Sequence, residues 1–137
     1  MYTPVSSRAA SAYRQVGVQS GVDGASPHML IKMLFDGLMQ SLNAARGAMQ
    51  RGEIDEKGRH LGKAVRILEE GLKGGLNPEQ GGEIAANLRA LYDYCIKSLT
   101  LANLRNDISL VEEVVELITP VAQSWEQIGA GNQGGGV

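Results

Sequence analysis

Between residues 26 and 128, apolar residues recur every three or four positions in four long segments. This spacing places them on one face of an α-helix. No segment alternates apolar and polar residues over the length of a strand, so a sheet is not expected. Because only a few residues connect the segments, neighbouring helices must run antiparallel. The pattern therefore predicts an all-α fold, an up-down four-helix bundle over residues 26–128.

Local signals mark the ends of the first two helices. Ser26 is a suitable N-cap, and Pro27 suits the first helical position. The first helix is therefore predicted from Pro27 to Arg51, with Gly52 as its left-handed cap. The second is predicted from Asp55 to the glycine pair at 74–75.

The third and fourth helices have similar signals. Asn77 and Pro78 predict the start of a helix that ends near Arg105, although the glycine pair at 81–82 is expected to delay it by a turn. Ser109, with Glu112 three residues later, forms a predicted capping box for a last helix that ends at Ile128. Pro120 lies inside this helix and predicts a kink near Leu117.

The apolar faces of the first and last helices are wider than a simple bundle requires. At 100° per residue, the apolar positions of each cover roughly 180°, whereas a helix that buries one side needs a stripe of little more than ~100°. The surplus must be covered by another part of this protein, by a second copy, or by a foreign chain.

The two ends of the chain differ from the bundle in composition. Residues 1–25 are predicted to form an N-terminal arm with a short helix over about 9–18, whose apolar edge carries Tyr13 and Val16. The Gly-rich tail, 129–137, has little to bury and is predicted to be disordered.

Composition excludes several classes of function. The net charge is −2 and basic residues do not cluster, so nucleic acid is not an expected partner. No apolar run reaches the 18 residues that suggest a membrane-spanning helix, so membrane insertion is not expected. A single cysteine and the lack of a secretory signal indicate a cytoplasmic protein.

Candidate chemistry is sparse. His28 and His60 lie on different predicted helices with no spacing typical of a metal site, so we expect no metal and no cofactor. Cys95 falls on an apolar stripe and is expected to be a buried thiol. His60 with Lys63 loosely resembles the motif of histidine-phosphotransfer domains, so a phosphotransfer function stays open as an alternative. Apart from that alternative, the chain is not expected to be an enzyme.

Several stretches together resemble the FliS family, the export chaperones for flagellin. They are Ala12-Tyr13 with Val16, Ala25-Ser26-Pro27 followed by LIKMLFDG at 30–37, GGEIAANLRALYDY at 81–94, and Trp125. The resemblance implies a cytoplasmic helical bundle that holds the disordered C-terminal segment of flagellin in apolar surface grooves, one chaperone to one cargo. It also implies that capture prevents premature polymerisation and that the complex is delivered to the export gate of the flagellar type III secretion apparatus.

The resemblance also implies where the partner binds. Tyr13 and Val16 are the expected lid of the groove in the free protein, and the stretch from Leu30 to Leu38 is its expected wall. The full set of expected partner-binding residues is Tyr13, Val16, Leu30, Leu34, Phe35, Leu38, Leu88, Tyr92, Ile96 and Trp125. Other flagellar regulators are further candidate partners. A self-associating bundle, or a weak homodimer of the free protein, stays open as an alternative use of the wide apolar faces.

Overall fold

The computed structural model describes the backbone of residues 25–135 and the side chains of residues 25–128. Within that part of the chain the structure is helical and contains no strand, which confirms the predicted fold class. The elements are α2 (Pro27–Arg51), α3 (Ile54–Arg66), η1 (Ile67–Lys73), α4 (Pro78–Arg105) and α5 (Ile108–Gly135). The predicted arm helix over 9–18 lies outside the described residues.

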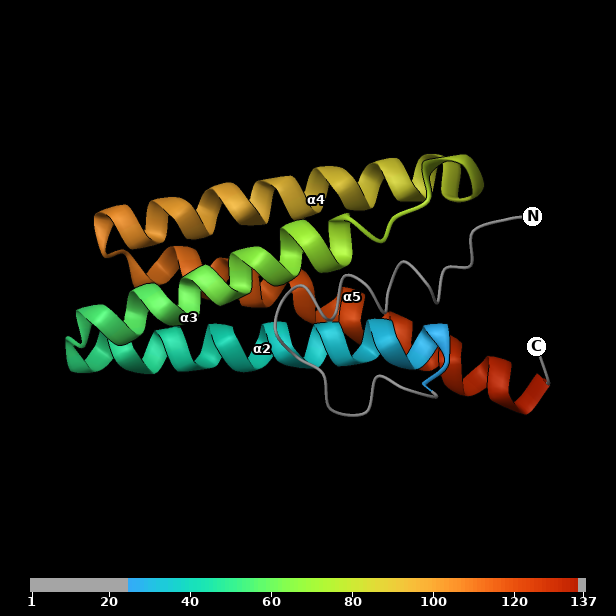
Figure 1. The fold of residues 1–137 in the computed structure, drawn as a ribbon, viewed down its shortest axis with the longest axis horizontal. Helices are drawn as coiled ribbons and strands as arrows, with labels where there is room; N and C mark the ends of the chain where they lie inside the picture. The colour runs from blue at the N-terminus through green and yellow to red at the C-terminus, as the bar shows by residue number, and fades with distance from the viewer. Residues whose placement is uncertain (1–24, 136–137) are drawn as a thin grey trace.

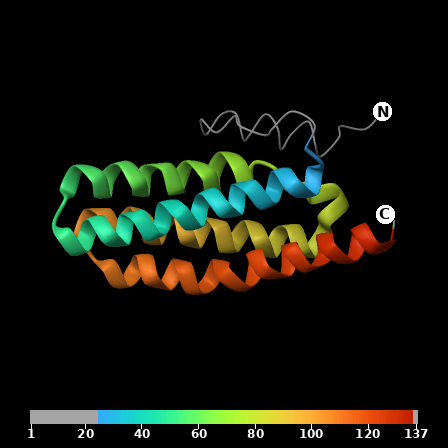
Figure 2. The same ribbon diagram turned by 90° about the horizontal axis from the view of Figure 1, so that it is seen from below.

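The helices run up and down around a shared core. α3 continues directly into η1, so the two form one long rod, and the connections between rods are short (Figure 1). α2 packs against α3 and α5, and α4 packs against α5 and the α3–η1 rod. Figure 2 shows the same antiparallel arrangement from a second side.

The caps of α2 and α4 agree with the sequence signals. The Ser26 side chain accepts a hydrogen bond from the Met29 backbone N–H at 3.1 Å, and Gly52 ends α2 with φ +72°. The Asn77 side-chain oxygen accepts from the N–H groups of Glu79 and Gln80. α4 starts at Pro78, and Gly82 interrupts it after the first turn with φ +54° and ψ −128°. The glycine pair therefore kinks the helix near its start instead of delaying its first residue.

The capping residue predicted for the last helix is wrong. The carboxylate of Asp107 accepts from the Ser109 N–H at 3.0 Å and from the Ser109 hydroxyl at 2.6 Å. Asp107 therefore caps α5, and Ser109 lies inside its first turn. A carboxylate fits this position better than a hydroxyl, because its negative charge also interacts favourably with the positive N-terminal end of the helix dipole.

The last helix extends beyond the end that the apolar pattern predicted. α5 is assigned as helix to Gly135, beyond Ile128, and the disorder of the Gly-rich tail, 129–137, stays a prediction. The apolar pattern marks the packed part of a helix, whereas each added residue of a formed helix gains its own hydrogen bond. Residues 136–137 lie outside the description. α5 passes through Pro120 as one assigned helix, and the kink near Leu117 stays a prediction.

The second rod ends in a π-helix that the sequence did not predict. In η1 the Gly74 N–H donates to the Glu69 carbonyl, five residues earlier, at 3.1 Å. Such wide turns are rare, and they frequently lie at functional sites. In this protein, η1 also brings Leu72 to the end of the bundle where α4 begins.

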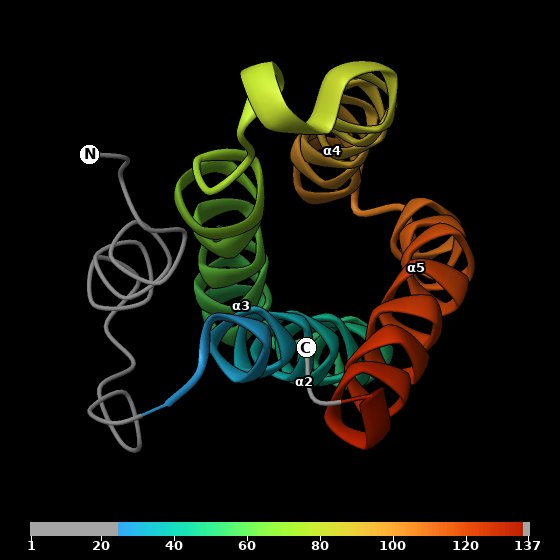
Figure 3. The same cartoon turned by 90° about the vertical axis from the view of Figure 1, so that its right-hand side faces the viewer.

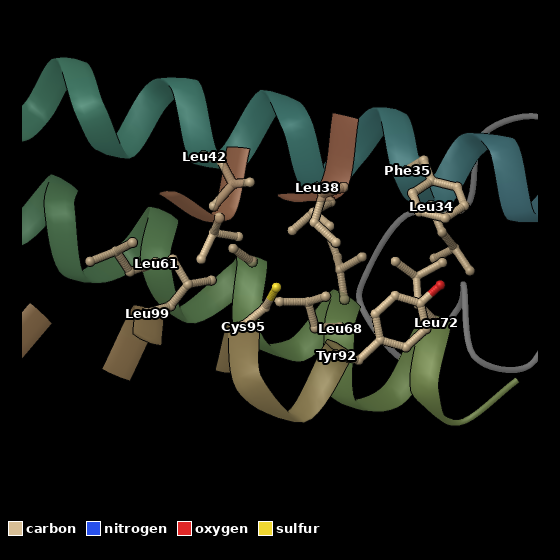
Figure 4. Close-up of a cluster of buried hydrophobic side chains, with 14 of the residues drawn as sticks. Leu34, Phe35, Leu38, Leu42, Leu61, Leu68, Leu72, Tyr92, Cys95 and Leu99 are labelled. Carbon is tan, nitrogen blue, oxygen red and sulfur yellow. The ribbon is translucent and has the colours of Figure 1, made fainter. Parts of the chain in front are cut away.

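The core explains most of the apolar width of α2. Leu34, Leu38 and Leu42 point from α2 toward side chains of the α3–η1 rod and α4 (Figure 4). They are at most 1% exposed. Val111, Val114 and Ile118 of α5, each fully buried, complete the same cluster.

A buried lysine joins α3 and α4 where α2 ends and α3 begins. Lys57 is only 7% exposed. Its ammonium group donates to the Asn103 carbonyl at 3.2 Å and to the Asn106 side-chain oxygen at 3.3 Å. Since carbonyls in the last turn of a helix lack intrahelical donors, Lys57 satisfies one of them and fixes this end of the bundle.

A candidate partner-binding groove between α4 and α5

An apolar groove of about 630 Å³ lies at the opposite end of the bundle, where α4 begins. We call it the α4–α5 groove, because these two helices supply most of its walls. Its lining residues are Ile31, Phe35, Leu72, Gly75, Leu76, Asn77, Gln80, Gly81, Ile84, Ala85, Leu88, Tyr92, Pro120, Val121, Ser124, Trp125 and Ile128. Few of these side chains are polar, so the groove suits an apolar partner rather than a charged metabolite.

The paths of the two helices leave the groove open. Figure 3 shows the C-terminal part of α5 beside the start of α2 and away from the start of α4. There the Trp125 indole N–H donates to the His28 carbonyl at 3.1 Å. The rings of His28 and Trp125 stack with centroids 4.7 Å apart.

The rims of the groove carry large apolar side chains in contact with solvent. Ile84 on α4 is 71% exposed, and Ile128 on α5 is 52% exposed. Single exposed apolar residues are common on protein surfaces, but a cluster around a concave apolar surface is typical of an interaction site.

The structure brings four of the expected partner-binding residues together. Phe35, Leu88, Tyr92 and Trp125 come from three helices and all line the α4–α5 groove. Phe35 and Tyr92 are 3% exposed and form its floor, whereas Leu88 and Trp125 are half-buried. Burial raises the pKa of the Tyr92 hydroxyl, so this group stays protonated.

Other expected positions lie elsewhere. Within the expected wall from Leu30 to Leu38, only Ile31 and Phe35 line the groove. Leu30, Leu34 and Leu38 are 0–1% exposed core residues. They are buried because α2 packs against both the second rod and α5. Ile96 is half-buried against the core, outside the groove lining, and Tyr13 and Val16 lie outside the described residues.

Sequence reasoning missed several groove residues. Ile31, Leu72, Leu76, Val121 and the rim pair Ile84 and Ile128 were not among the expected partner-binding positions. Most of them belong to the same apolar patterns as the core, so no periodic signal separates the two groups. The glycine pair at 81–82, which bends the start of α4, is the local feature that points to this end of the bundle.

The remaining reactive groups lie away from the groove rims. Cys95 is fully buried, and burial raises the pKa of its thiol to about 12, so it does not form the thiolate a nucleophile needs. His60 lies 3.4 Å from the Glu56 carboxylate on the α3 surface. Among the described residues, no three His, Cys, Asp or Glu side chains gather as a metal site requires.

No described helix is both long and apolar enough to cross a membrane.

Comparison with known proteins gives the family. Residues 9–132 match the family described as "Flagellar protein FliS". The flagellar secretion chaperone FliS of Salmonella typhimurium is 52% identical over 117 residues, 85% of this chain and 87% of that protein. FliSB of Pseudomonas aeruginosa, also a flagellar secretion chaperone, is 45% identical over 88% of this chain and 95% of its own length. FliS of Bacillus subtilis is 32% identical over 80% of each chain.

These matches cover the bundle, and they support the chaperone interpretation over the phosphotransfer alternative. The chain belongs to the FliS family of flagellar secretion chaperones, and it is not an enzyme.

Proposed function

We propose that this chaperone binds the C-terminal segment of flagellin in the α4–α5 groove, one cargo to one chaperone, in the cytoplasm. Binding keeps that segment from polymerising early, and the complex is then delivered to the flagellar type III export apparatus. The observation that carries the proposal is the open apolar groove of about 630 Å³ with exposed apolar rims.

The groove suits a segment that becomes helical on binding. An amphipathic helix docks by inserting side chains from one face into an apolar groove. Each Leu- or Phe-sized side chain removed from water contributes about 1.5–3 kcal/mol. Several such side chains are needed, because ordering a disordered segment costs about 2–5 kcal/mol.

The N-terminal arm completes the proposal. In the free protein, the apolar edge formed by Tyr13 and Val16 covers part of the groove, and cargo displaces it. A protein whose apolar groove is covered is less prone to aggregation than one whose groove is open to solvent. This role rests on the family resemblance and on the apolar spacing of the arm.

A pair of leucines on α4 tests the groove. Leu88 is half-buried in it, whereas Leu104 is 79% exposed at the far end of the same helix. By calorimetry with the C-terminal flagellin segment, the wild type should bind one-to-one. Leu88→Glu should weaken binding by more than tenfold, about 1.4 kcal/mol or more, and Leu104→Glu should leave it unchanged.

Two outcomes contradict the proposal. No binding by the wild type at tens of micromolar removes flagellin as the cargo. Wild-type affinity in a folded Leu88→Glu variant removes the groove as its site. If sedimentation instead shows that the free protein is a stable dimer that Leu88→Glu dissociates, a second copy occupies the groove.

A further inference from the structure

α5 has two halves that are held in different ways. In the first half, Val111, Val114 and Ile118 are fully buried. Tyr94 of α4 also donates a hydrogen bond to Glu113 at 2.9 Å. After Ile118, none of the residues 119–128 is fully buried. Val121, Ala122 and Trp125 are half-buried and still pack against the core, so the second half of α5 is held by shallower packing than the first half and by individual contacts.

The most specific of these contacts joins Trp125 to His28 on α2. The indole N–H donates to the His28 carbonyl at 3.1 Å, and the two rings stack with an angle of 12° between their planes. Stacked aromatic pairs stabilise a structure by more than the burial of their apolar area alone. The contact fixes both the position and the direction of the indole.

The junction between the halves is suited to bending. Pro120 has no N–H, so the helix loses one hydrogen bond there. The Thr119 hydroxyl donates to the Val115 carbonyl at 2.7 Å, a bond that often bends helices. The second half of α5 can therefore change direction without disturbing the buried first half.

An open apolar groove tends to close. Ile84 and Leu88 lie on the α4 side, and Val121 and Ile128 lie on the α5 side. Their approach would remove apolar surface from water, which is favourable. The second half of α5 lies away from α4 because it packs on the core and contacts His28 of α2.

We propose that the His28–Trp125 contact is a latch that holds the second half of α5 on α2 and thereby keeps the α4–α5 groove open. His28 and Trp125 are positioning residues in this role. The effect on groove width is independent of any cargo, whereas the effect on cargo affinity rests on the proposed function.

Spin labels across the groove measure its width without cargo. Labels at Glu83→Cys on α4 and Gln127→Cys on α5 use exposed positions, in a Cys95→Ala background because Cys95 is the single native cysteine. Dipolar spectroscopy should give shorter and broader distances in His28→Ala, which lacks the stacked ring. His28→Phe keeps a stacked ring and should restore the wild-type distribution.

Trp125→Phe provides a second variant, because it keeps an aromatic wall but lacks the indole N–H. It should also shorten the label distance, and circular dichroism checks that each variant is folded. Unchanged or longer distances in folded His28→Ala and Trp125→Phe overturn the latch.

Cargo binding tests the second part of the inference. His28→Ala should weaken binding of the flagellin segment at least tenfold, and His28→Phe should restore it. A shortened label distance with unchanged affinity overturns the link between latch and cargo. A wild type that binds no flagellin segment contradicts the proposed function, while the label distances still decide whether the latch exists.

Discussion

At the scale of single residues, two glycines in the second rod have opposite surroundings. Gly71 in η1 is buried, and a Cβ built on it would lie 2.9 Å from a terminal methyl group of Leu34. Gly62 in α3 is exposed, and a Cβ there would meet nothing within 4 Å. Gly71 therefore permits close packing of η1 on α2, whereas Gly62 has no such role.

Alanine at these two positions should change stability in opposite directions. Gly71→Ala should lower the free energy of unfolding by about 1–3 kcal/mol, because Leu34 is a core residue with little room to move. Gly62→Ala should raise it by roughly 0.5–1 kcal/mol through helix propensity. Urea unfolding measures both, and a Gly71→Ala protein as stable as Gly62→Ala would show that the core adjusts easily.

At the scale of whole elements, the sequence predicted helices better than their junctions. The caps at Ser26, Gly52 and Asn77 were predicted because capping depends on residues next to one another in the chain. For α5, Asp107 and Ser109 both offer suitable side chains, and only the backbone conformation of the turn decides between them. The π-helix η1 has no comparable sequence signal.

The Asp107 cap predicts a pH dependence of stability. Hydrogen bonds from Ser109, first from its side chain and then from its backbone, lower the pKa of the Asp107 carboxyl. Because this pKa is lower in the folded state, the contribution is present above the unfolded value, about 4, and is lost as the pH falls through the folded value. The wild type should therefore be more stable than Asp107→Asn at pH 7, and this difference in the free energy of unfolding should be smaller near pH 3. An equal difference at both pH values, by urea unfolding, argues against a charged cap.

At the scale of the whole molecule, the wide apolar faces have two uses. Much of the apolar width of α2 is buried in the core, as Leu30, Leu34 and Leu38 show, whereas the second half of α5 borders the groove. Periodicity gives the direction of each side chain but not its neighbour, so the sequence could not separate core from groove. Four of the expected partner-binding residues, Phe35, Leu88, Tyr92 and Trp125, line one groove because three helices converge there.

The N-terminal arm allows a test of competition within the molecule. A tethered arm occupies the groove at a high effective concentration, which cargo must overcome. Deleting residues 1–18 should therefore tighten binding of the flagellin segment, measured by calorimetry. Unchanged affinity would exclude competition by the arm, and weaker binding would mean that the arm belongs to the bound surface.

The central claim is that cargo binds the α4–α5 groove, and nuclear magnetic resonance of the isotope-labelled chaperone tests it most directly. On titration with the C-terminal flagellin segment, the largest changes in chemical shift should fall on Ile84, Leu88, Val121 and Ile128 and on the indole of Trp125. Ile54 and Leu104, exposed apolar residues outside the groove, are the internal controls and should not change. Shift changes centred on those two residues, or a titration that changes nothing, would contradict the account.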